Sequence, residues 1–86
     1  MSDQIRPELR SFILRTFLIG EPADSLQDAT PLITSGIITS LAMLDLVSHL
    51  ETTYRVTIPH DQLSAHKLDS VDRIVEMITE LRRAGG

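Results

Sequence analysis

The sequence predicts an all-α protein, a small four-helix bundle with three longer helices and one short helix. Three stretches repeat apolar residues at steps of three and four, which is the period of an amphipathic helix. The single stretch of alternating β-branched residues is too short to build a sheet. None of these helices can bury its apolar stripe alone, so the stripes are expected to pack together in one domain, residues 1–86.

The first helix is expected over residues 3–19. Its apolar positions are Ile5, Leu9, Phe12, Ile13 and Phe17. Pro7 leaves its start open, because proline fits the first turn of a helix but clashes deeper inside. A long loop follows, residues 20–39, and a loop of this length is usually functional or packed down by its own apolar residues. Those residues are Leu26, Leu32, Ile33 and Ile37.

The second helix is expected over residues 40–54. Its predicted buried stripe is Leu41, Leu44, Val47, Leu50 and Tyr54, widened by Met43 and Leu46. Val56 and Ile58 then form a short extended piece before Pro59, and a single helical turn is expected over residues 61–65. The last helix, residues 70–83, is capped by Asp69 or Ser70. Its apolar face is Val71, Ile74, Val75, Ile78 and Leu81, and its last turn carries Arg82 and Arg83.

Composition argues against several classes of function. The chain has no cysteine, so it forms neither a disulfide nor a thiolate metal site. Its polar start, Met1 to Gln4, lacks the apolar stretch of a signal peptide, and a cytoplasmic protein is expected. No apolar run approaches the roughly 20 residues that span a bilayer, so no membrane insertion is expected. Residues 21–61 hold six acids and one base, which argues against nucleic acid and favours partners with basic patches.

A serine at the start of the second helix is the strongest candidate functional residue. It lies in the first of four motifs, which are Gly36-Ile37-Ile38-Thr39-Ser40-Leu41, Leu46-Val47-Ser48-His49-Leu50-Glu51, Val56-Thr57-Ile58-Pro59 and Asp69-Ser70-Val71. In this order the motifs resemble those of the acyl carrier protein family, including the peptidyl and D-alanyl carriers, over nearly the whole chain. The resemblance implies a bundle of the acyl-carrier type and a protein that is a carrier and not an enzyme.

In that family the serine bears 4′-phosphopantetheine, transferred from coenzyme A and joined by a phosphodiester, so the resemblance assigns this role to Ser40. It implies a phosphoprotein that holds its cargo as a thioester, in fatty-acid, nonribosomal-peptide or polyketide biosynthesis. The implied partners are a phosphopantetheinyl transferase, a ligase or synthase that loads acyl or aminoacyl cargo, and a downstream acyltransferase. A monomer is expected, and the residues expected to contact partners are Ile38, Thr39, Leu41, Met43 and Asp45.

Two departures from the family pattern bear on recognition and cargo. Thr39 stands where the family usually has Asp, and threonine can still cap the helix but brings no negative charge to its positive end. Three residues separate Gly36 from Ser40, a spacing closer to D-alanyl and aminoacyl carriers than to fatty-acid carriers. By analogy, the apolar face of the second helix, opposite the last helix across Val56 and Ile58, is a candidate shelter for an acyl chain.

Other interpretations give these residues simpler roles. A serine at a helix start commonly caps it, an effect of about 1 kcal/mol. The alternative function is a helical interaction module that keeps the carrier fold but is not modified, and Thr39 in place of the usual Asp keeps this alternative open. Ser40, His49 and Asp45 match a hydrolase triad in residue type only, because Ser40 and His49 lie about 13 Å and half a rotation apart on one helix. We expect His49 and Asp45 to form an exposed pair, and the three histidines lack the spacing of a zinc site. The C-terminal Gly85-Gly86 also ends ubiquitin-like modifiers, but those are built on a β-sheet.

Overall fold

Helices form all the regular structure of the computed structural model, which describes residues 2–84 and the side chains of residues 4–59 and 61–84. The elements are α1 (Ser2–Phe17), the 3₁₀ turn η1 (Ala23–Ser25), α2 (Ser40–Tyr54), the 3₁₀ turn η2 (His60–Gln62), α3 (Ala65–Leu68) and α4 (Val71–Ala84). Helix makes up 65% of the structure, and the described range contains no strand. The predicted all-α fold with three longer helices and one short helix is confirmed. No helix among residues 2–84 has both the length and the apolar character needed to cross a bilayer.

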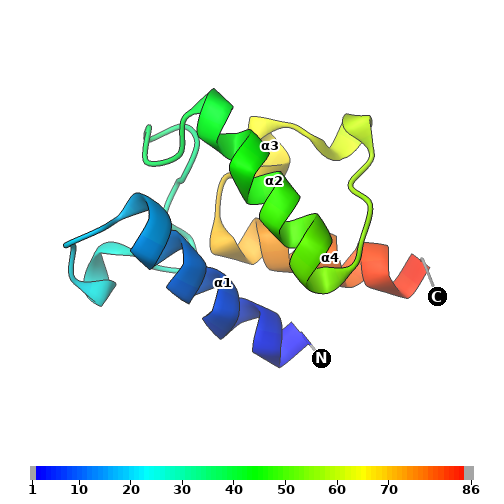
Figure 1. Cartoon of the computed structure of the whole chain (residues 1–86), viewed down its shortest axis with the longest axis horizontal. Coiled ribbons are helices and arrows are strands. Elements are labelled where there is room, and N and C mark those ends of the chain that lie inside the picture. The colour runs from blue at the N-terminus through cyan, green and yellow to red at the C-terminus, as the bar shows by residue number, and fades with distance from the viewer. Residues whose placement is uncertain (1, 85–86) are drawn as a thin grey trace.

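One hydrophobic core joins the three longer helices. Helix α4 packs against both α1 and α3, and α2 runs diagonally across the view in Figure 1, with its start beside the long loop. The buried residues of α1 are Ile5, Leu9 and Ile13, and those of α4 are Val71, Ile74, Val75, Met77 and Ile78. The predicted stripes of these two helices are therefore confirmed, with Phe12, Phe17 and Leu81 half-buried at the margin of the core.

The predicted stripe of α2 is wrong in its first two turns. Leu46, Val47 and Leu50 are buried, but Leu41 is 81% exposed and Leu44 is 57% exposed. At 100° per residue, Leu41 and Leu44 lie on the side of the helix opposite the buried residues. They therefore form an apolar surface that points away from the core.

The end of α1 and the position of the short helix differ most from those predicted, while the start of α1 and both ends of α4 differ by a single residue. Helix α1 ends at Phe17, two residues early, and the chain turns at Gly20, whose φ is 84°. The short helix lies later than residues 61–65. A 3₁₀ turn occupies residues 60–62, and α3 starts only after Ser64, whose Oγ accepts a hydrogen bond from the N–H of Lys67 at 3.2 Å. Since the capping serine comes late, the α-helical turn comes late as well.

The long loop between α1 and α2 is fastened to both α1 and α4. Its fully buried side chains are Leu26, Leu32 and Ile38, while Ile33 and Ile37 are half-buried. The Asp28 carboxylate pairs with Arg6 at 3.1 Å and with Arg10 at 3.2 Å, both on α1. The Asp28 carbonyl accepts the N–H of Asp72 on α4 at 3.0 Å. The prediction that this loop is packed down by its own apolar residues is confirmed.

Candidate functional site

Ser40 is the first residue of α2, and the residue before it caps the helix. Thr39 has extended backbone angles, φ −72° and ψ 167°, and its Oγ1 accepts the N–H of Ala42 at 3.1 Å. Ser40 is exposed, and within residues 2–84 no hydrogen bond joins its hydroxyl to another group. The sequence left both Thr39 and Ser40 as possible caps, and the structure gives the capping role to Thr39, so the Ser40 hydroxyl is not required to cap the helix.

The segment before Ser40 closes on itself through its backbone. The N–H of Gly36 donates to the Ile33 carbonyl at 3.1 Å, and the N–H of Ile38 donates to the Leu32 carbonyl at 2.8 Å. Gly36 has a φ of 87°, in the region that residues with a Cβ rarely adopt, so this turn favours glycine. The loop reverses at Gly36 and delivers the chain to Thr39 and Ser40.

The carboxylate of Asp69, just before α4, binds this turn. Its Oδ1 accepts the N–H groups of Ile33 at 2.8 Å and Thr34 at 2.9 Å, and that of Leu32 at 3.2 Å. Its Oδ2 accepts the Thr34 hydroxyl at 2.9 Å. These bonds, led by that from the Thr34 N–H, hold the pKa of Asp69 below its ordinary value. The sequence placed Asp69 or Ser70 as the cap of α4. The structure assigns that role to Ser70, whose Oγ accepts the N–H of Arg73 at 3.2 Å.

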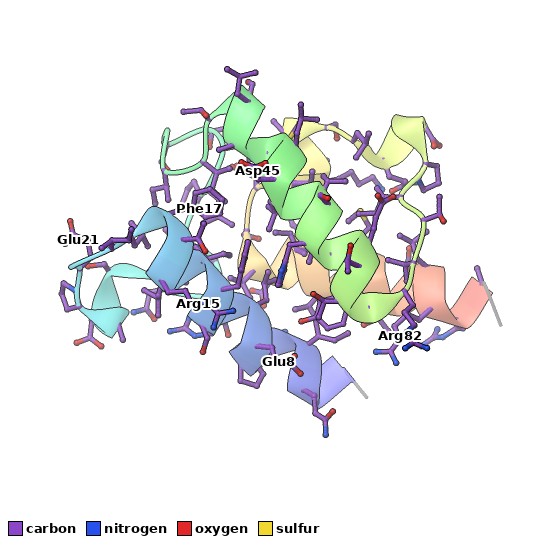
Figure 2. All side chains as sticks on the ribbon, viewed as in Figure 1. Glu8, Arg15, Phe17, Glu21, Asp45 and Arg82 are labelled. Carbon is purple, nitrogen blue, oxygen red and sulfur yellow. The ribbon has the colours of Figure 1, made fainter. Side chains whose placement is uncertain are left out.

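The other expected partner contacts divide into exposed and buried residues. Leu41 and Asp45 are exposed near the start of α2, and Met43 is half-buried; Figure 2 shows Asp45 in the half of α2 nearest the loop. The expectation that Ile38 lies on this surface is wrong, because its side chain is 0% exposed and belongs to the core. Leu44 joins the exposed surface instead. The three-residue spacing between Leu41 and Leu44, which is visible in the sequence, places both side chains on the same side of the helix.

His49 packs against α1 and does not form the expected exposed pair with Asp45. Its ring stacks on Phe12, with centroids 3.7 Å apart and an angle of 5° between the planes. Burial lowers the pKa of His49, and the positive charge of Arg15 lowers it further. No ion pair joins His49 to Asp45 within residues 2–84. His49 therefore contributes to the contact between α1 and α2. The described residues include no group of three His, Asp or Glu side chains arranged to hold a metal ion.

A groove lies at the far end of α2, about 20 Å along the helix from Ser40. It is lined by Tyr54, Arg55, Val56, Thr57, Leu81, Arg82 and Ala84. Ile58 is buried, and its N–H donates to Glu51 Oε2 at 2.8 Å. The Tyr54 hydroxyl is buried without a hydrogen-bond partner among the described residues, and burial raises the pKa of Tyr54. Shelter of an acyl chain between α2 and α4 stays a prediction.

No protein-family model matches the chain, and no curated protein matches it. The candidate site therefore depends on the motifs of the sequence and on the geometry around Ser40.

Proposed function

We propose that the chain is an acyl or aminoacyl carrier with a bundle of the acyl-carrier type. Ser40 bears 4′-phosphopantetheine, and the cargo is held there as a thioester and delivered to partner enzymes. One observation carries the proposal. Ser40 presents an exposed hydroxyl on the first residue of α2 while Thr39 performs the capping. A serine that has no structural task at this position is free to be modified.

The start of α2 suits a phosphodiester on this hydroxyl. Thr39 accepts the N–H groups of Ala42, through Oγ1, and of Met43, through its carbonyl at 2.8 Å. The N–H groups of Ser40 and Leu41 have no acceptor within the helix. The first turn of α2 contains no acidic residue, so no carboxylate within that turn neutralises its positive dipole end. When bound, the cofactor supplies the terminal thiol that a chain without cysteine lacks.

The exposed leucines beside Ser40 support contact with partner enzymes. Leu41 follows Ser40 directly, and Leu44 lies one turn further along the same outward side of α2. Apolar side chains that point away from the core are typical of protein interaction surfaces. We assign to this surface the transferase that modifies Ser40, the ligase or synthase that loads the cargo, and the acyltransferase that removes it.

Intact-mass measurement tests the proposal. The purified protein is incubated with coenzyme A, Mg²⁺ and a phosphopantetheinyl transferase of broad specificity. The expected result is the addition of one phosphopantetheine to wild type and to Ser48→Ala, and none to Ser40→Ala. Ser48 is a matched control because it is an exposed serine on the same helix.

An unmodified wild-type protein would contradict the carrier proposal and favour the interaction module, which would use Leu41 and Leu44 without an arm. Modification of Ser40→Ala would place the attachment on another residue and would equally contradict the assignment.

A further inference from the structure

We propose that Asp69 is a positioning residue that holds the loop before α2 in the shape that presents Ser40 to a modifying transferase. This inference rests on the proposed carrier function. Asp69 lies 29 positions after Ser40 in the sequence. Its carboxylate binds Ile33 and Thr34, at the beginning of the turn that leads into α2.

One carboxylate holds three consecutive residues of the loop. The N–H groups of Leu32, Ile33 and Thr34 converge on Oδ1, and the Thr34 hydroxyl binds Oδ2. The N–H of Leu32 also donates to the Asp69 carbonyl at 2.7 Å. Hydrogen bonds to a charged acceptor are stronger than those to a neutral one. The loop has no helix or strand pairing here, and these bonds join it to Asp69, just before α4.

A short series of contacts connects Asp69 to Ser40. Asp69 fixes Leu32, and the Leu32 carbonyl accepts the N–H of Ile38 at 2.8 Å. Ile38 is fully buried, and Thr39, which caps α2, follows it directly. A shift of the turn at Ile33 and Thr34 therefore moves the cap of α2 and the residue that it presents.

Two variants separate this role from a general loss of charge. Asp69→Ala removes all four side-chain bonds, while Asp69→Asn keeps one oxygen acceptor and loses the negative charge. Glu76→Gln is the matched control, because Glu76 is an exposed carboxylate on α4 that forms no ion pair within residues 2–84. Circular dichroism identifies the variants that retain the helical fold, and if Asp69→Ala unfolds, Asp69→Asn is measured in its place.

Hydrogen exchange gives a readout that does not depend on modification. In Asp69→Ala we expect the N–H groups of Ile33 and Thr34 to exchange at least about tenfold faster, which corresponds to about 1.4 kcal/mol. The N–H of Leu32 retains the Asp69 carbonyl as an acceptor and should change less. The decisive amide is that of Ile38, which does not touch Asp69. Faster exchange there shows that the fastening extends toward Ser40, and unchanged exchange at Ile38 overturns the inference.

The rate of modification by the transferase completes the test. We expect kcat/KM for Asp69→Ala to fall about tenfold relative to wild type and Glu76→Gln, and the fall for Asp69→Asn to be smaller. Modification of folded Asp69→Ala at the wild-type rate would overturn the positioning role and leave the proposed function intact. Absence of modification in wild type would instead reject the proposed function, and the exchange at Ile38 would still decide whether Asp69 shapes the loop.

Discussion

Replacing Thr39 by Ala should destabilise the protein, whereas replacing Ser40 by Ala should not. Thr39 Oγ1 accepts the N–H of Ala42 at 3.1 Å, and loss of such a cap typically costs about 1 kcal/mol. For a domain of 86 residues, this corresponds to a fall in Tm of roughly 4 to 8 °C. The Ser40 hydroxyl makes no bond within the described chain, and exposed substitutions of this kind usually change stability by at most about 0.5 kcal/mol.

Urea unfolding followed by circular dichroism measures both free energies on the same footing. Thr39→Asp provides a third point, because aspartate caps equally well and adds a negative charge at the helix start, which typically contributes about 0.3 to 1 kcal/mol. The expected order of stability is Thr39→Asp, then wild type and Ser40→Ala, then Thr39→Ala. The reasoning is refuted if Ser40→Ala loses about 1 kcal/mol while Thr39→Ala loses nothing, because Ser40 would then be the cap.

Two further predictions concern the loop and the orientation of α2. Hydrogen bonds, led by that from the Thr34 N–H, hold the pKa of Asp69 below its ordinary value of 3.8. The contribution of Asp69 to stability is therefore complete above about pH 5 and is lost as the pH falls through the lowered pKa. The difference in unfolding free energy between wild type and Asp69→Asn should therefore shrink as the pH falls from 7 to 3, and a constant difference contradicts this account. Leu46→Ala should cost about 2 to 5 kcal/mol because Leu46 is fully buried, whereas Leu44→Ala should cost less than about 1 kcal/mol. Equal losses in chemical unfolding would show that the inward side of α2 is misassigned.

The helices that the sequence predicted best are those with one clear apolar stripe. In α1 the residues Ile5, Leu9 and Ile13 recur at four-residue steps, and all three are buried. In α4 the apolar face is bounded by charged residues such as Asp72, Arg73 and Glu76, so only one side can enter the core. For α1 and α4, the sequence of the helix alone therefore predicts which side is buried.

The buried side of α2 was harder to predict, because apolar residues surround most of the first half of this helix. Leu41, Met43, Leu44, Leu46 and Val47 offer more than one possible buried side, and periodicity does not choose between them. In the folded protein the side with Leu46 and Val47 packs into the core, and Leu41 and Leu44 are exposed. Similarly, His49 stacks on Phe12 because α1 lies beside that side of α2, a neighbour that spacing within one helix does not reveal.

The candidate site was predicted in part. The cap at Thr39 and the start of α2 at Ser40 follow from local capping chemistry, which involves residues only three positions apart. The bonds from Asp69 to the loop join residues more than 30 positions apart in the sequence. The burial of Ile38 depends on the shared core, so no local pattern predicts either feature.

The sequence by itself determined that the chain is helical, where α2 begins and which serine stands at its start, because helical period and capping depend on neighbouring residues. Only the tertiary structure decided which side of α2 faces outward and how the loop before it is held. Those outcomes depend on how the helices share one core and on which distant groups accept the loop's N–H groups.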